Sequence, residues 1–502
     1  MSDQSNGILP GINHIIVLML ENRSFDNLLG WLYDPANAPP FDTVPAGQTF
    51  DGVSGKDLAI PGPDGTMVPV GSTADTTNPY PDPGEAYEEV YGQLYDQNPP
   101  PHGVAPGTVP PDPPQPPPMT GFVRNYALQD GVTQPGAIMN GFRPDALPSF
   151  SLLAHSYVTC DRWFASVPSQ TLTNRSFVHA GTASGHVNNA DGLLPVFIND
   201  TDTIYDLLEE NGRDWRIYYG GHWFLCNAYL TQAHLTKYML NNSRRFQPFE
   251  ALLDDAARGN LPDYAFVEPN FLDSLHYGRE NDMHPAAGLA NIDDMPSDAR
   301  FGDELVRRLY QALRSGPHWD NTLLIVTFDE HGGCYDHVPP GPAVPPDDRI
   351  IPPGADGYSG FGFDRLGVRV PAVLISPRLP AGVVDHTVYD HTAIIRTVLE
   401  RFGVAPEQMA RLGQRVMNAN VINPPLCPPR DDGPVLSMPS VADRSASQDS
   451  PLMGMRATMV NAAMRHLLPD GAPSLPAVTT KLGAEQTLIA MANQWMRQRP
   501  RG

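Results

Sequence analysis

Two long apolar runs in this chain end in the same way, and both are typical of buried strands. They are residues 15–20 and 322–328. Continuous apolar runs of this length favour strands covered on both faces, as in a parallel sheet. Each run is followed at once by a pair of oxygen-bearing side chains, Glu21-Asn22 and Asp329-Glu330. We therefore expect both pairs at the carboxyl ends of strands, the edge where open α/β sheets bind ligands.

If both strands belong to one parallel sheet, the four side chains meet. One such pair alone more often caps a helix, but two pairs at matching places favour a ligand set. Buried acids placed together repel each other unless a cation holds them. Because all four donors are oxygens, the set favours Ca²⁺, Mg²⁺ or Mn²⁺ and leaves Zn²⁺ or Fe open.

The composition limits the class of protein. With 502 residues and 41% hydrophobic residues the chain is globular, so its 55 prolines belong to ordered loops. The net charge of −23 argues against nucleic acid as a partner and against docking on anionic lipid, but not against single lipid molecules. The four cysteines form no C-x-x-C pair, and we expect free, buried thiols. The oligomeric state stays open.

The first apolar run resembles the core of a signal peptide, but it lacks a basic region before it and a cleavage site after it. No other apolar run is long enough to span a membrane. We expect a soluble protein that is cytoplasmic or exported without an encoded signal peptide.

Strand and helix patterns alternate along most of the chain, which predicts an α/β fold with a doubly wound, mostly parallel sheet and helices on both faces. We expect one core over residues 1–423, interrupted by a Pro/Gly-rich insertion at about 33–119. Residues 424–502 read as a Pro/Ser-rich connector followed by helices near 457–468 and 482–497, which pack on the core.

A loop rich in hydroxyl groups leads into a helix that we expect to begin near Thr173. Helix N-termini favour phosphate groups, and a metal-activated hydroxyl needs no Ser-His-Asp triad. Thr171 and Ser169 are both candidates for a nucleophile, and chemistry alone does not choose between them. Asn174 and Arg175 follow closely and could hold phosphoryl oxygens. No G-x-S-x-G elbow or Walker A loop is present.

Several histidines also stand near predicted strand ends. Each one alone is more often structural, but three of them are paired with acids, in Asp282-x-His284, Asp336-His337 and Asp390-His391. Another, His222, follows Gly220-Gly221 after a short predicted strand.

Taken together, the motifs resemble those of the bacterial phosphoesterase family, which contains phosphatidylcholine-type phospholipases C and acid phosphatases and belongs to the alkaline phosphatase superfamily. The similarity runs from about residue 14 to residue 403. The motifs that carry it, in chain order, are H-I-I-V-L-M-L-E-N-R-S-F-D, D-R-W-F-x-S-V-P-x-x-T-x-x-N-R, N-D-x-H-P and T-F-D-E-H-G-G-x-Y-D-H-V-x-P-P.

The resemblance implies an alkaline-phosphatase-like core and a metal-dependent phosphoesterase. It implies that the metal is held by Glu21, Asn22, Asp329 and Glu330. It also implies that Thr171 attacks phosphorus to give a phosphothreonine intermediate, and that His284 acts with it by protonating the leaving alcohol. The side chains expected to contact the phosphate ester, possibly a phospholipid, are Asn22, Asn174, Arg175, His222 and His337.

The chain departs from the family pattern in three respects. Thr173 stands where the T-x-P-N-R motif commonly has proline, Glu85 stands where some members have a histidine, and no twin-arginine signal is present. Two alternatives remain: a non-catalytic binding protein or pseudoenzyme on the same fold, and a sulfatase-like hydrolase. The sulfatase motif C/S-x-P-x-R is absent.

Overall fold

The computed structural model describes most of the chain. The described residues are 7–97, 115–189, 199–241, 244–272, 279–285, 297–349, 361–437, 460, 463–464 and 481–498. Within these ranges no helix is both long enough and apolar enough to cross a membrane.

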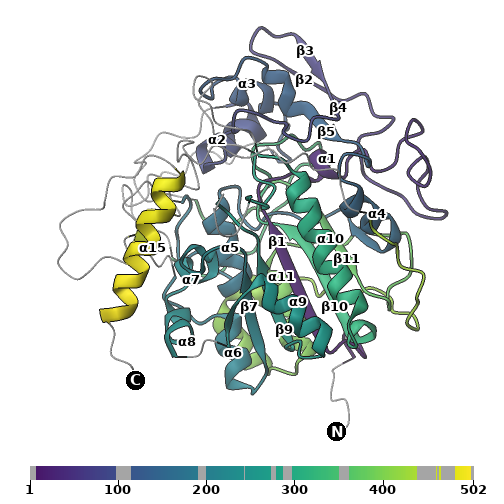
Figure 1. Ribbon diagram of the computed structural model, residues 1–502. Helices are drawn as coiled ribbons and strands as arrows, with labels where there is room; N and C mark the ends of the chain where they lie inside the picture. Colours follow the sequence, from purple (N-terminus) through teal and green to yellow (C-terminus); the bar gives the residue numbers. More distant parts are fainter. Residues whose placement is uncertain are drawn as a thin grey trace.

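A single eight-stranded sheet forms the centre of the molecule (Figure 1). Its strands, in spatial order, are β12 (Val383–Asp385), β6 (Val158–Cys160), β11 (Ala372–Ile375), β10 (Thr322–Phe328), β1 (His14–Leu20), β9 (Tyr264–Glu268), β7 (Trp215–Tyr219) and β8 (Phe246–Pro248). The two apolar runs are therefore neighbours, and every residue of β10 is buried.

Strands β1 and β10 pair in parallel, in a register that sets Leu20 opposite Phe328. This register brings the two polar pairs to one edge, as the sequence predicted. Strand β11 departs from the parallel pattern, because it runs antiparallel to both β10 and β6. The described residues between β10 and β11 contain no helix, and parallel pairing would require a long crossover connection, usually a helix. The sheet is thus mostly parallel.

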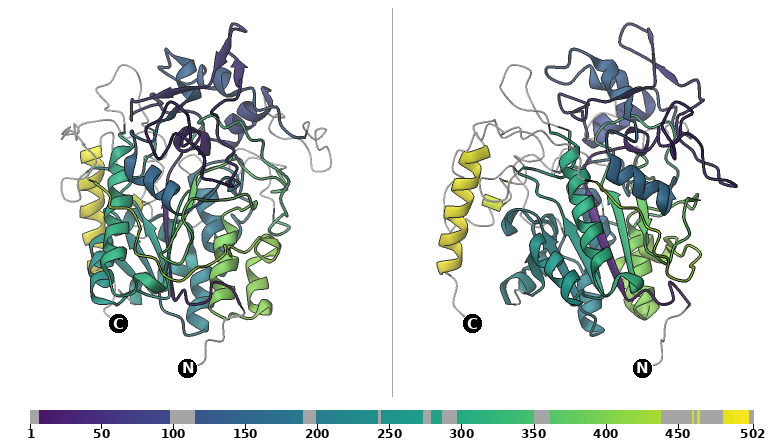
Figure 2. Two further views of the ribbon diagram at one scale, coloured as in Figure 1. Left: turned by 90° about the vertical axis from the view of Figure 1, so that its right-hand side faces the viewer. Right: turned by 45° about the vertical axis from the view of Figure 1, so that its right-hand side comes forward.

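Helices cover both faces of the sheet (Figure 2), which confirms the doubly wound α/β fold. One group packs together on one face: α4 (Pro148–Ser156), α9 (Phe249–Arg258) and α10 (Arg300–Ser315). The other group is α5 (Thr171–Ala180), α6 (Ile204–Glu210), α7 (Asn227–Thr231), α11 (Thr392–Arg401) and α13 (Gln414–Asn418). Shorter helices are α1 (Phe25–Leu28), α8 (Thr236–Asn241) and α12 (Pro406–Met409).

The Pro/Gly-rich insertion lies over the carboxyl end of β1, at the top of Figure 1. It contains α2 (Tyr87–Tyr95) and three short strands, β2 (Ala59–Pro61), β3 (Met67–Pro69) and β4 (Gly71–Thr73), while α3 (Phe122–Tyr126) and the short strand β5 (Asn140–Phe142) follow it in the chain. A second apolar core joins α2 and α3 to Phe177 of α5 and to Tyr335, which follows β10. The insertion is therefore packed against the edge of the sheet that carries the polar pairs.

The C-terminal region also contacts the core. Arg430 donates to the carbonyl oxygens of Ser156 and Leu379, and α15 (Lys481–Gln498) buries Leu488 in the main core. The predicted helix near 457–468 and most of the proline-rich stretch 99–118 of the insertion lie outside the described residues. The division into a core and a C-terminal part stays a prediction.

Candidate active site

The four predicted ligands stand side by side at the carboxyl edge of β1 and β10, and all four are fully buried. The backbone N–H of Asn22 donates to Asp329 Oδ1 at 3.1 Å, and that of Arg23 donates to the carbonyl oxygen of Glu330 at 3.0 Å. Asn22 has a φ of +57°, in the left-handed region that asparagine tolerates better than most residues. These contacts fix the two strand ends to each other.

Arg175 lies among these carboxylates. Its Nε donates to Asp329 Oδ2 at 2.9 Å, and its Nη2 is 3.4 Å from Glu21 Oε1. Nη2 also donates to the carbonyl oxygens of Met19 and Leu20. In this arrangement Arg175 neutralises the strand-end acids, and its predicted contact with substrate stays a prediction.

Burial and mutual repulsion perturb the acids at this edge. Burial raises the pKa of the Glu21 carboxyl well above its usual value, and the neighbouring Asp329 raises it further. Burial likewise raises the pKa of Glu330, with further contributions from Glu85 and Asp329. Glu21 Oε2 and Glu330 Oε1 have no hydrogen-bond partner in the described structure. Two buried acceptor oxygens without donors are the chemistry that a cation would satisfy.

Two other groups of acids and histidine within the described ranges lie close enough to bind one ion: Asp26 with Asp336 and His337, and Asp202 with Asp206 and His234. Among the strand-end acids, Arg175 pairs with Asp329, and the N–H of Gly332 donates to Glu330. Arg369 already pairs with the first group, and Lys237 and Arg411 with the second. Within the described regions the strand-end acids include buried carboxylate oxygens without hydrogen-bond partners, Glu21 Oε2 and Glu330 Oε1, and neither of the other two groups does.

The two candidate hydroxyls, those of Thr171 and Ser169, have different hydrogen-bond partners. Helix α5 begins at Thr171, two residues earlier than predicted, and the Thr171 hydroxyl donates to Asn22 Oδ1 at 3.2 Å. The Ser169 hydroxyl instead donates to the carbonyl oxygen of Val187 and contacts Asn188 Oδ1 at 3.0 Å. Only the Thr171 hydroxyl is thus bonded to a predicted metal ligand.

Asn174 stabilises the loop that precedes α5. Its Oδ1 accepts from the N–H of Val167, and its Nδ2 donates to the carbonyl oxygens of Val167, Ser169 and Gln170. These contacts hold the loop that presents Thr171, and a direct contact between Asn174 and substrate stays a prediction.

His284 lies on the insertion side of the site. It is buried, its Nε2 is 3.6 Å from Glu85 Oε2, and its Nδ1 is 3.6 Å from Asp82 Oδ1. The backbone N–H of His284 donates to Asp282 Oδ1, while the carbonyl oxygen of Asp282 accepts from the N–H of Glu21. His284 is therefore linked through Asp282 to a predicted ligand.

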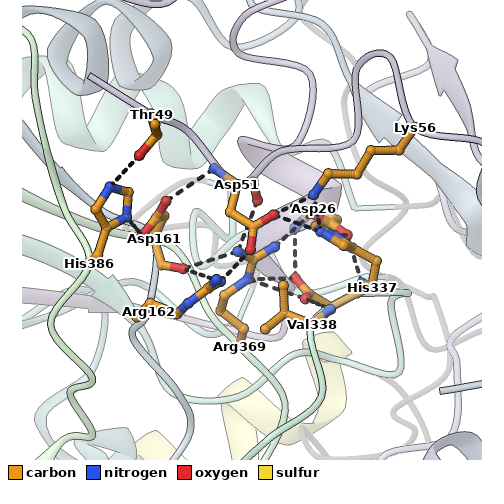
Figure 3. A network of polar contacts seen from close by, with 11 residues as sticks. Asp26, Thr49, Asp51, Lys56, Asp161, Arg162, His337, Val338, Arg369 and His386 are labelled. Atoms are coloured by element: carbon orange, nitrogen blue, oxygen red, sulfur yellow. Dashed lines mark hydrogen bonds and ion pairs between the residues drawn. The ribbon is translucent and has the colours of Figure 1, made fainter. Parts of the chain in front are cut away.

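His222 and His337 lie in other surroundings. His222 Nε2 contacts Glu485 Oε1 of α15 at 3.0 Å, and its ring stacks on Phe224. His337 belongs to a network of ion pairs around Arg369 (Figure 3), in which its Nδ1 contacts Asp26 Oδ2 at 2.6 Å. Neither contact tests the predicted substrate role of these histidines.

Burial lowers the pKa of His337, but hydrogen bonds to Asp26 and Asp51 outweigh this and raise it to about 9. Lys56 approaches the same ring nitrogen as Asp51, at 2.6 Å, and its charge opposes protonation. Because the carboxylates of Asp26 and Asp51 outnumber the single ammonium group of Lys56, the charged form of the His337 imidazole is favoured. Its charge thus helps to join α1, the insertion and the loop after β10.

Two further residues at the site, Asn227 and Glu268, belong to none of the sequence motifs described above. Asn227, at the start of α7, places its Nδ2 3.5 Å from Glu21 Oε1, and its Oδ1 is buried without a hydrogen-bond partner in the described regions. Glu268, at the end of β9, accepts from the N–H groups of Asn227 and Ala228 and so fixes that helix end. No sequence pattern connects Asn227 with Glu21.

Curated relatives match most of the chain. Non-specific phospholipase C6 of Arabidopsis thaliana is 33% identical over 450 residues, which are 87% of this chain and 76% of the relative. Phospholipase C A of Mycobacterium tuberculosis (strain ATCC 25618 / H37Rv) is 28% identical over 443 residues, or 80% of this chain and 75% of the relative.

Among solved structures, a protein in the alkaline phosphatase superfamily from Vibrio parahaemolyticus matches 69% of this chain and 82% of its own, at 14% identity and a TM-score of 0.33. The model of the Phosphoesterase family matches residues 12–405. The chain is therefore a hydrolase that belongs to the Phosphoesterase family, as the strand-end and x-x-N-R motifs predicted.

Proposed function

We propose that this chain is a metal-dependent phosphoesterase of the phospholipase C or acid phosphatase type, with Thr171 as its nucleophile. One observation carries the proposal: the Thr171 hydroxyl is bonded to Asn22 at an edge where buried carboxylate oxygens lack partners. The relatives named phospholipase C support a phosphodiester, and a phospholipid in particular, as substrate.

Thr171 is the first residue of α5, so a phosphoryl group next to its hydroxyl would lie at the N-terminus of a ten-residue helix. The partial positive charge of that helix end favours a phosphate. The loop contacts of Asn174 and the Asn22 hydrogen bond hold the attacking oxygen in place. Such positioning removes much of the entropic barrier to attack.

Glu21, Asn22, Asp329 and Glu330 would hold the cation. When bound, a divalent cation lowers the pKa of a hydroxyl and neutralises charge that develops on the phosphoryl oxygens. Thr171 Oγ1 forms a bond to phosphorus while the bond from phosphorus to the alcohol breaks. Thr171 releases its proton to solvent water, and the leaving alcohol takes up a proton from His284, which regains one from the water that attacks in the next step. Water then hydrolyses phosphothreonine, releases the phosphate product and restores the hydroxyl.

The test is turnover of p-nitrophenyl phosphate and p-nitrophenylphosphorylcholine with a panel of divalent cations. Thr171→Ala should lower kcat by more than about 10³-fold, beyond the effect of one charge-stabilising donor. Thr171→Ser should retain activity, and Ser169→Ala is the matched control. Trapped phosphoenzyme should map to Thr171 by mass spectrometry. A Thr171→Ala enzyme within about tenfold of wild type, or wild type that turns over neither substrate, would refute the proposal.

A further inference from the structure

Glu85 comes from the insertion, yet it reaches the centre of the site. The segment before it is pressed against the loop that follows β10. A Cβ atom at Gly333, whose φ is +67°, would lie 2.7 Å from the carbonyl oxygen of Gly84 and 2.6 Å from Pro83 Cβ. Gln93 of α2 donates to the same Gly84 carbonyl oxygen at 2.7 Å. These contacts hold the Glu85 backbone in position. The residue is buried, with 7% of its surface exposed.

A single side chain, that of Asn22, connects the Glu85 carboxylate to the Thr171 hydroxyl. Its Oε2 accepts from Asn22 Nδ2, and the other end of the same amide, Oδ1, accepts from Thr171. Its Oε1 is 3.4 Å from Nε2 of Gln170, the residue before Thr171. A phosphoryl group attacked by Thr171 would therefore lie close to the negative charge of Glu85.

No arginine offsets this charge in the described structure. Arg175 pairs with Glu21 and Asp329. The contacts of Glu85 are the two amides and His284 Nε2 at 3.6 Å. Glu330, a fourth carboxylate, is close enough to Glu85 for Glu85 to contribute to the raised pKa of Glu330. Among the contacts of Glu85 in the described regions, the His284 imidazole is the one group that can carry a positive charge, so a second negative charge on the substrate gains no further cation from the chain.

We propose that Glu85 is a specificity-determining residue that makes this site favour phosphodiesters over phosphomonoesters. The inference rests on the proposed function. Above pH 7 a phosphomonoester carries close to two negative charges, whereas a diester carries one. The carboxylate of Glu85 therefore repels the monoester more strongly than the diester. Since like charges at such short range repel strongly even in partly solvated sites, the discrimination is large.

The experiment compares kcat/KM for p-nitrophenyl phosphate with that for bis(p-nitrophenyl) phosphate at pH 8, with one divalent cation at fixed concentration. Glu85→Gln removes the charge but keeps an oxygen that can accept from Asn22. It should raise the monoester-to-diester ratio at least about tenfold. Glu85→Asp keeps the charge and should leave the ratio within about threefold. Glu250→Gln removes an exposed carboxylate on α9 and should not change it.

A binding measurement does not depend on turnover. By calorimetry, Glu85→Gln should bind inorganic phosphate at least about tenfold more tightly than wild type does at pH 8, with diethyl phosphate changed by less than about threefold. An unchanged ratio in an active Glu85→Gln enzyme, or equal changes for the two anions, overturns the role of Glu85. If wild type turns over neither ester with any cation, the proposed function fails, and the binding comparison still decides whether Glu85 discriminates by charge.

Discussion

Arg175 offers the clearest test of how the acidic edge is stabilised. The change Arg175→Gln removes an ion pair with Asp329 and one with Glu21, and it removes the donor to two strand carbonyl oxygens. Arg175 and both acids are fully buried, and leaving a buried charge unpaired costs about 3–5 kcal/mol. With an unfolding entropy of roughly 2.1 cal/mol/K per residue, a chain of 502 residues should lose about 3–5 °C in Tm.

The assay is thermal unfolding of metal-free protein, repeated with each divalent cation. If the strand-end acids hold a cation, adding it should recover most of the loss, because the ion neutralises the oxygens that Arg175 no longer pairs. Arg308→Gln is the control, since Arg308 pairs with the exposed Glu250 and should contribute less than about 1 kcal/mol. A metal-free Arg175→Gln protein that melts within about 1 °C of wild type would refute the reasoning and restore Arg175 as a free substrate contact.

Two further predictions concern the metal and pH. The Asp329→Asn protein should lose bound cation and activity together while the fold persists, because the change removes the charge of a ligand. Unchanged metal content by elemental analysis would contradict the ligand assignment. Because the folded pKa of His337 is raised to about 9, its contribution to stability should be complete below its unfolded value of 6.5 and decline as pH rises through 9. The contribution is about 3 kcal/mol at most. His337→Gln should therefore lower Tm clearly at pH 6 and little at pH 10, and an equal loss at both would show that the charge is not responsible.

The central pair of strands could be predicted because two unbroken apolar runs have few other places in an α/β fold. Their polar ends followed from the geometry of a parallel sheet, and the register of β1 and β10 confirms that Glu21 and Asp329 meet. The hydroxyl loop could be placed at a helix start, and the family resemblance favoured Thr171, but the different contacts of Thr171 and Ser169 could not be predicted from the sequence.

Other parts of the site depend on contacts through space. The insertion has little periodicity, so nothing in the sequence shows that Glu85 lies against Asn22. Asn227 approaches Glu21 from a helix more than 200 positions away. The antiparallel direction of β11 depends on the connection that precedes it, and an apolar run reads the same in both directions. Each of these features is decided by packing between segments far apart in the chain.

The pairing of β1 with β10 has a consequence for biosynthesis. β1 (His14–Leu20) leaves the ribosome before β10, with which it pairs along its whole length and which begins at residue 322. At about 5–20 residues per second, β1 waits roughly 15–60 s for that partner. Until then its apolar residues lack one neighbour, and non-local pairing of this kind makes folding slow and exposed to aggregation. The candidate active site, whose halves sit on these two strands, is assembled only after β10 has been made.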